Sequence, residues 1–359
     1  MISLNRFFFQ GKMSTDFDVL VDVCFEDDNG SVETFLNRES VSSTIYDGSR
    51  RNIHNFKYTE ILSPTFTLVK KDFSDFTELE NRKILAWLTG STKVERMVCY
   101  KDDSDVVSFV LVGNITQIEQ RKISNSRVIG YEFVFEHMSP FAYSPVKSIT
   151  KTITTPETFT IKCYTDVYEK LLYPKITITI GDSIYLPVTE DPTTETFEML
   201  SNTVYEYNGQ YYIKISGQKH ALSVTPNKIE NQTADASTVN TYCLSTFDKT
   251  VYLGIVADNQ YGWQKIVTVG AGFEVKNTYY ENGVDTTVKS TVTDCYEHEI
   301  ITLDGDNRVI SSSYTPMRII GESFNWDWIY FVPGENKITI SGACDVTIEW
   351  VEPIKIGNI

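Results

Sequence analysis

Short runs in which apolar and polar residues alternate recur along almost the whole chain. In a strand such runs place their side chains on opposite faces in turn, so that one face can be buried. Turn-forming residues separate the runs, and the Asn-Gly steps at Asn29-Gly30 and Asn282-Gly283 are typical of tight hairpins. The pattern predicts a mainly β protein, with strands at residues 18–26, 65–69, 106–112, 131–135, 175–180, 211–215, 250–256, 336–340 and 345–351.

One segment follows a helical period instead. Thr77 and Glu80 stand at the spacing of a capping box, and Gly90 tolerates the left-handed conformation at a helix end. The apolar positions between them repeat at helical spacing and are expected to share one face: Leu79, Ile84, Trp87 and Leu88. The sequence therefore predicts one helix over residues 77–90, laid on a sheet, with Trp87 as a core anchor rather than a ligand platform.

Polar, turn-rich stretches divide the chain into two predicted domains. The first spans residues 1–145, and residues 146–158, rich in Thr and Lys with one proline, are expected to form a connector. Residues 159–359 form the second domain. Within it, the stretch 182–241 is rich in Thr, Asp and Asn, which suggests long loops or a small insertion.

Composition narrows the function classes. Of the 359 residues, 41% are hydrophobic and 22% charged, as in ordinary globular proteins. The net charge of −16 repels phosphate backbones and argues against sequence-general nucleic-acid binding. The longest apolar stretch, near residues 106–112, is far shorter than the ~18–20 residues of a membrane-spanning helix. Residues 1–12 have no signal-peptide core, so we expect a protein made in the cytosol.

The cysteines and histidines do not form a recognisable metal or catalytic motif. The six cysteines include no C-x-x-C pair, lie in apolar settings and are predicted to be buried free thiols: Cys24, Cys99, Cys163, Cys243, Cys295 and Cys344. Glu297-His298-Glu299 is expected in a strand, with a structural or solvated histidine. Asp304-Gly305-Asp306-Asn307 is similar to part of a calcium loop, but a turn is the better interpretation. No nucleotide-binding fingerprint is present, and no cofactor is expected.

Aromatic residues leave carbohydrate binding open as a second class of function. Phe324, Trp326 and Trp328 are expected to share one face of a strand, which favours a buried sandwich layer. Trp263, flanked by turn residues, is the candidate sugar contact. An enzyme is the third class, because 48 acidic residues could supply a carboxylate pair by chance.

The order of several motifs resembles that of distal tail proteins from long-tailed, non-contractile bacteriophages. These motifs cover about the first 145 residues and, less closely, the last 70: Phe7-Phe8-Phe9-Gln10-Gly11, Ser14-Thr15-Asp16-Phe17, Tyr46-Asp47-Gly48-Ser49-Arg50, Ala86-Trp87-Leu88, residues 130–135, Ser139-Pro140-Phe141-Ala142-Tyr143, Thr302-Leu303-Asp304, residues 329–332, Pro333-Gly334-Glu335-Asn336 and residues 346–351. The galectin sugar-binding signature H-x-N-x-R is missing. The stretch 182–241 would be an elaboration of the second domain.

The resemblance implies an N-terminal β-sandwich with one helix, followed by a galectin-like β-sandwich. It implies a structural virion component that forms a homo-hexameric ring at the tail tip and is assembled in the host cytoplasm. The ring would join the tail tube protein to a tail-associated lysin or adhesion hub protein, and it could carry a receptor-binding protein. DNA would pass through its lumen without specific binding, which the acidic net charge suits.

A ring needs heterologous contacts between copies. We expect the polar loop at residues 37–57 and the hairpin at residues 117–127 to reach the adjacent acidic subunit. The candidate inter-subunit residues are Arg50, Arg51, Arg121, Lys122 and Arg127. A carbohydrate-binding adhesin that contacts the host surface is the alternative function.

Overall fold

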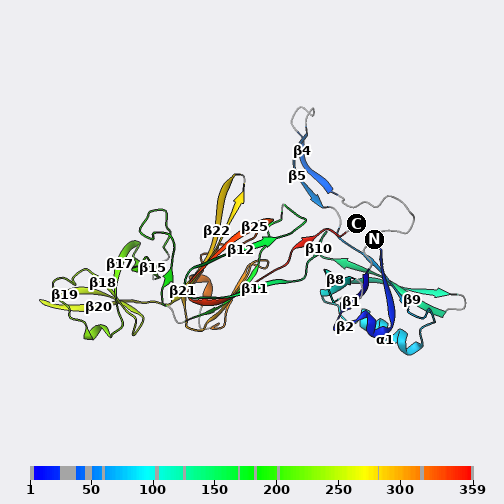
Figure 1. Cartoon of the computed structure of the whole chain (residues 1–359), viewed down its shortest axis with the longest axis horizontal. Helices are drawn as coiled ribbons and strands as arrows, with labels where there is room; N and C mark the ends of the chain where they lie inside the picture. Colours follow the sequence, from blue (N-terminus) through cyan, green and yellow to red (C-terminus); the bar gives the residue numbers. More distant parts are fainter. Residues whose placement is uncertain are drawn as a thin grey trace. The chain divides into compact units, whose positions relative to one another are not determined.

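The computed structural model describes residues 4–24, 38–44, 51–58, 61–101, 105–123, 127–168, 170–181, 184–199, 203–281, 283–315 and 319–356. The chain forms two compact units, each described here by itself (Figure 1). The first contains Met1–Pro145, Thr165–Val167 and Val351–Ile359, and the second contains Val146–Tyr164 and Tyr168–Trp350. The fold is mainly β, as predicted, and each of the nine predicted strands falls on an observed one.

The first unit is built on one antiparallel sheet of order β2-β1-β7-β8-β9-β6-β3. Its strands are β1 (Leu4–Phe9), β2 (Lys12–Met13), β3 (Val19–Cys24), β6 (Thr65–Lys70), β7 (Glu95–Lys101), β8 (Val107–Ile123) and β9 (Arg127–His137), with a 3-10 turn η1 (Ser14–Phe17) between β2 and β3. β10 (Ala142–Tyr143) pairs with both β8 and β27 (Pro353–Ile354), so the C-terminal segment belongs to this unit. β4 (Arg38–Thr44) and β5 (Arg51–Tyr58) form a separate hairpin.

The predicted helix is confirmed as α1 (Glu78–Leu88), the single α-helix of the described residues. The Thr77 side chain accepts a hydrogen bond from the Glu80 amide, and the Glu80 carboxylate accepts one from the Thr77 amide, which completes the capping box. Ile84, Trp87 and Leu88 are buried as expected. Leu79 is not: it is 60% exposed, because the nine residues to Leu88 make about two and a half turns and place it on the opposite face.

Aromatic rings fill the core that α1 covers. Trp87 is 3% exposed and lies between Phe7 and Phe17, with ring centroids 5.4 and 4.4 Å away. Its indole N–H donates a 2.7 Å hydrogen bond to the Phe9 carbonyl oxygen. The prediction that Trp87 anchors the core is confirmed, and the bond ties the helix to β1.

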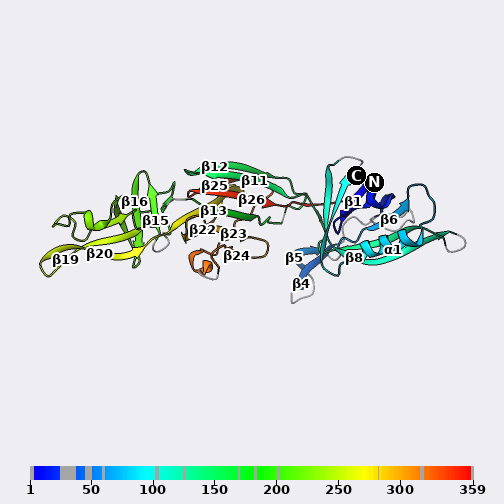
Figure 2. The same ribbon diagram turned by 90° about the horizontal axis from the view of Figure 1, so that it is seen from below.

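The second unit contains a β-sandwich (Figure 2). One sheet has the order β11-β26-β13-β23-β24, with β11 (Lys147–Ile153), β13 (Lys175–Ile180), β23 (Ile300–Asp304), β24 (Val309–Ser312) and β26 (Cys344–Trp350). The other has the order β12-β25-β21-β22, with β12 (Glu157–Cys163), β21 (Ala271–Glu281), β22 (Val284–Cys295) and β25 (Gly334–Ser341). Isoleucine and valine from both sheets, including Ile178, Val346, Val275 and Ile338, form the core between them.

Two expectations about this unit need correction. Residues 146–158 do not form a connector, because β11 pairs with β26 along its whole length and β12 begins at Glu157. Their polar character reflects a solvated strand face. The stretch 182–241, expected as long loops or a small insertion, instead contributes strands to a larger sheet. This seven-stranded sheet runs from β14 (Leu186–Pro187) through β15 (Val204–Tyr207), β16 (Gln210–Ile215), β17 (Gln218–Thr225), β18 (Tyr242–Ser245) and β19 (Thr250–Ala257) to β20 (Gln260–Thr268), with a 3-10 turn η2 (Ile229–Asn231) before β18.

The described cysteines have the predicted form. Five cysteines are free and buried: Cys99, Cys163, Cys243, Cys295 and Cys344. The side chain of Cys24 is not among those that the structure describes. Burial raises the pKa of the Cys344 thiol to about 12, so it stays protonated at neutral pH. Within the described ranges, no helix is long and apolar enough to cross a membrane.

Candidate functional site

The hairpin of β8 and β9 carries three of the predicted inter-subunit residues, and two of them already have partners in their own chain. Arg121 pairs with Glu132 across the hairpin, and Arg127 pairs with Asp75 at 3.0 Å. Lys122 is exposed beside Arg121, and the described residues offer it no ion-pair partner. The hairpin therefore presents one unpaired cation together with two that would have to exchange partners in an assembly.

The other two predicted residues cannot be placed in the same way. Arg50 lies outside the described residues. Arg51 begins β5, opposite Thr44 of β4, but its side chain is not described. The Asn29-Gly30 turn and Asn282 of the second Asn-Gly step likewise fall outside the described part, whereas Glu281 and Val284, on either side of the second step, pair as the ends of β21 and β22.

Trp263 was expected to be flanked by turn residues. It lies within β20, opposite Gly254 of β19. Backbone of residues 238–241 lies against Gly254, whose amide donates to the Thr241 carbonyl oxygen at 3.0 Å. A Cβ at Gly254 would stand 1.9 Å from the Thr238 carbonyl oxygen, so this close approach requires glycine. Trp263 is partly buried on the same face, and its buried indole N–H has no partner among the described residues. Sugar contact at Trp263 stays a prediction.

The structure also corrects two motifs. Glu297-His298-Glu299 forms a turn rather than a strand, with His298 exposed at φ 60°. Its buried Glu299 accepts hydrogen bonds from the Tyr296 amide and the Ser312 hydroxyl. The segment around Trp326 is not a strand either.

Trp326 adopts φ 62°, which interrupts the alternation of the three aromatic residues. Phe324, at the end of the 3-10 turn η3 (Ile320–Ser323), is 4% exposed, whereas Trp326 is 58% exposed. Trp328 packs at the margin of the sandwich core. The prediction of a shared buried face is therefore wrong for Trp326. Phe324 and Trp328 both pack against the core.

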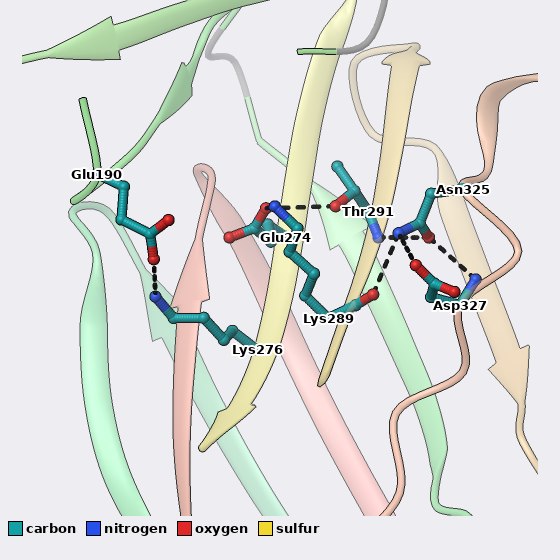
Figure 3. A network of polar contacts seen from close by, with 7 residues as sticks. All are labelled: Glu190, Glu274, Lys276, Lys289, Thr291, Asn325 and Asp327. Carbon is teal, nitrogen blue, oxygen red and sulfur yellow. Dashed lines mark hydrogen bonds and ion pairs between the residues drawn. The ribbon is translucent and has the colours of Figure 1, made fainter. Parts of the chain in front are cut away.

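A polar network that the sequence did not single out covers the outer face of the β21–β22 hairpin (Figure 3). Lys276 stands opposite Lys289, and Glu274 stands opposite Thr291. Like charges in a cross-strand pair destabilise a sheet unless they are compensated. Here Glu190 pairs with Lys276 at 3.0 Å, and Glu274 lies 3.7 Å from Lys289.

Asn325 extends the network to the segment after η3. Its Oδ1 accepts the Thr291 amide at 3.0 Å, and its Nδ2 donates to the Lys289 carbonyl oxygen at 3.1 Å and to Asp327 at 3.2 Å. These bonds pin the segment to the edge strand β22 (Figure 3). The Lys289 ammonium also lies 5.1 Å above the Phe197 ring, which links the hairpin to the residues between β14 and β15.

A cavity of about 330 Å³ opens beside this network. The network residues Glu274, Lys289, Thr291, Asn325 and Asp327 line one part, and Glu198, Met199, Tyr205 and Lys214 line the rest. The lining carries three carboxylates, of Glu198, Glu274 and Asp327, and two ammonium groups, of Lys214 and Lys289. Across the described ranges, no group of three or more His, Cys, Asp or Glu is placed to hold a metal ion.

Comparisons with known proteins identify the two ends of the chain. Residues 2–139 match the family of a phage tail protein N-terminal domain, and residues 261–350 match the corresponding phage tail C-terminal domain. These matches together cover more than half of the chain and confirm the resemblance to phage tail proteins. No curated protein gives a significant match.

Two solved phage structures are similar over nearly the full length. One is the SPP1 Dit protein, described as a paradigm of the hub adsorption apparatus in phages that infect Gram-positive bacteria. It has 12% identity and a TM-score of 0.48, covering 97% of this chain and 98% of that chain. The other is the phage P2 baseplate in its activated conformation with calcium, with 8% identity, a TM-score of 0.37 and the same coverage.

Proposed function

The chain belongs to the family of phage tail proteins defined by these two domains, and we propose that it is a hexameric ring hub at the tail tip or baseplate. In this role it joins the tail tube protein to the adhesion or lysin machinery and offers a docking place for a receptor-binding protein. Its work is structural rather than enzymatic. Assembly takes place in the host cytoplasm.

The family match carries this proposal, because it covers both the helix-bearing first unit and the C-terminal part of the sandwich. Most of the seven-stranded sheet lies between the two matched regions. We propose that this sheet is an addition to the two domains of the family.

The β8–β9 hairpin is the proposed ring contact. Lys122 is exposed, and Arg121 and Arg127 can exchange their partners Glu132 and Asp75 for carboxylates of an adjacent copy. The net charge of −16 makes such carboxylates abundant on the neighbour. Cationic residues at a contact between acidic subunits would reduce the repulsion that otherwise opposes the ring.

Negative-stain images of the purified full chain test the ring directly, and we expect a six-fold annulus. Native mass spectrometry of Lys122→Glu and Arg121→Glu should then show a smaller fraction of hexamer than the unaltered chain. Lys83→Glu, at an exposed position of α1, carries the same change of charge and should assemble normally. Equal hexamer fractions in all three variants would discard the hairpin contact, and a monomer at every concentration would discard the ring.

The proposed lumen passes DNA without retaining it. Because binding to duplex DNA rests on the release of counterions by Lys and Arg, an acidic ring should have little affinity even at low salt. We expect no shift of a short duplex in a gel at about 50 mM salt. A tight protein–DNA complex that dissociates as the salt concentration is raised would contradict a lumen that does not retain DNA.

A further inference from the structure

The turn between β23 and β24 presents an arginine in a strained conformation. The turn spans residues 305–308, one position later than the predicted 304–307. The Asp304 carboxylate, at the end of β23, accepts the Asn307 amide at 3.1 Å and the Asn307 side-chain N–H at 2.8 Å. The next residue, Arg308, has φ 56°, in the left-handed region that non-glycine residues seldom occupy. Such strain persists only where the surroundings compensate for it, and it is common at functional sites.

Contacts with aromatic rings compensate for the backbone strain at Arg308. The Arg308 guanidinium carbon lies 3.9 Å from the centroid of the Tyr173 ring and 5.6 Å from that of Trp328. Both rings are anchored in the sandwich. Trp328 contacts Phe324 at 5.1 Å, and Tyr173 contacts Tyr330 at 5.9 Å. We call Arg308, Tyr173, Trp328 and Tyr330 the Arg308 platform.

The platform is rigid at its base. The Tyr330 hydroxyl is hydrogen-bonded to the hydroxyl of Tyr279 at 2.6 Å, and Tyr279 is 4% exposed. Burial and this hydrogen bond raise the pKa of Tyr279, so its phenol stays neutral. A guanidinium held on such a base loses little conformational entropy when a ligand binds it.

The donors of Arg308 are free to bind something else. Arg308 is exposed and, within the described part of the chain, makes no hydrogen bond or ion pair. Stacking on Tyr173 uses the face of the guanidinium and leaves the N–H groups around its edge. Only two arginines follow residue 145, Arg308 and Arg318, in a protein with 48 acidic and 32 basic residues.

We propose that the Arg308 platform is a second inter-subunit contact, which binds a carboxylate side chain of a neighbouring copy. This inference rests on the proposed ring. Arginine, tyrosine and tryptophan are the residues that dominate the energetics of protein interfaces, and a guanidinium edge binds a carboxylate through two parallel hydrogen bonds. The excess of carboxylates on every copy supplies the complementary charge.

Native mass spectrometry and sedimentation of the full chain over a concentration series test the contact. We expect Arg308→Glu to raise the dissociation constant of the assembly about tenfold to a hundredfold. Arg308→Lys should also weaken assembly, because an ammonium cannot form the two-pronged bond. The exposed Lys337 of β25 provides the control: Lys337→Glu has the same change of charge and should stay within about twofold of the unaltered chain.

Arg308→Gly separates assembly from folding. Glycine adopts φ 56° without strain, so the variant should keep the hydrogen-exchange protection of β23 and β24 while it assembles as poorly as Arg308→Glu. If the unaltered chain forms rings and all three Arg308 variants match it, this contact is wrong and the ring stands. If the unaltered chain never assembles, both this contact and the proposed function fail.

Discussion

The two units bury their apolar residues in different ways. In the first unit, a few large rings meet under one helix: Phe66 and Phe133 stack at 5.1 Å, and Phe7 stacks on Trp87. In the sandwich of the second unit, isoleucine and valine from two sheets make up most of the core, and rings such as Phe331 and Trp350 lie among them. The first core is concentrated in a few residues, whereas the second is distributed over many.

This difference has a consequence for stability. An aromatic residue buries more surface than an aliphatic one, and Trp87 also carries a hydrogen bond to β1. A β-branched residue in a sandwich is one of many similar contacts, so a small change is absorbed more easily. We therefore expect single substitutions to be more damaging in the first unit.

Trp87→Ala should have the largest effect, about 3–5 kcal/mol, because it removes the ring between Phe7 and Phe17. Hydrogen exchange of α1 and β1 in the full chain measures it, since the loss should be confined to the first unit. Trp87→Phe keeps a ring but leaves the Phe9 carbonyl oxygen unpaired, which costs about 1–3 kcal/mol. If hydrogen-exchange protection were unchanged in Trp87→Ala, the first core would not depend on a few large residues.

Ile178→Ala, in the centre of β13, tests the distributed core. Ile178 is fully buried, and the substitution should cost about 2–4 kcal/mol, with the loss visible in the exchange of β13, β23 and β26. Ile178→Val, the matched smaller change, should cost about 0.5–1.5 kcal/mol. A larger loss for Ile178→Ala than for Trp87→Ala would reverse the ranking of the two cores.

The sandwich core of the second unit also contains a buried polar pair, Asn336 and Asn277, whose hydrogen bonds can be tested separately from its apolar contacts. Asn336, which is fully buried, accepts the Val332 amide at 2.9 Å and a hydrogen bond from Asn277 at 3.0 Å. Asn336→Ala leaves both donors without this partner and should cost about 1–3 kcal/mol. Faster exchange of the Val332 amide would report the loss. Asn336→Asp keeps the acceptor but loses the Nδ2 donor to the Val332 carbonyl oxygen at 2.8 Å and buries a carboxyl group, so it should not restore the protection of that amide.

Local spacing was enough to predict much of this fold. The helix followed from Thr77, Glu80 and the apolar positions 84, 87 and 88, and the strands followed from alternation. Leu79 has the apolar side chain of a buried position, but its angle around the helix axis places it on the face opposite Leu88. β11 was missed because its polar residues are paired with β26, almost two hundred residues away, and no local signal reports such a partner.

The polar network could have been found in part. The Asn282-Gly283 step predicts a two-residue hairpin in which Glu281 pairs with Val284. Counting outward from this pair places Lys276 opposite Lys289 and Glu274 opposite Thr291, as the structure has them. Because two lysines directly opposite each other repel, acidic partners near this pair are expected. That Glu190 and Asn325 supply the remaining contacts could not be predicted, because they arrive from distant loops.

The smallest predicted effect concerns pH and the helix that closes the aromatic core. Hydrogen bonds from the Thr77 amide and hydroxyl, together with Lys70 at 3.1 Å, hold the pKa of Glu80 below its ordinary value of 4.5. A lowered pKa in the folded state stabilises the protein above the unfolded value. This contribution is lost as the pH falls below about 4.5 and through the folded pKa.

Glu80→Gln isolates the charge, because glutamine can still complete the capping box. The side chain is 40% exposed, so solvent screening limits the difference to about 0.5 kcal/mol at pH 7. In hydrogen exchange of α1, the unaltered chain should progressively lose its advantage over Glu80→Gln as the pH falls below 4.5. Glu78→Gln, at an exposed position of the same turn, controls for the general effect of an acidic residue near a helix start. If the unaltered chain and Glu80→Gln were equally protected at pH 7, the charge of Glu80 would not stabilise this helix.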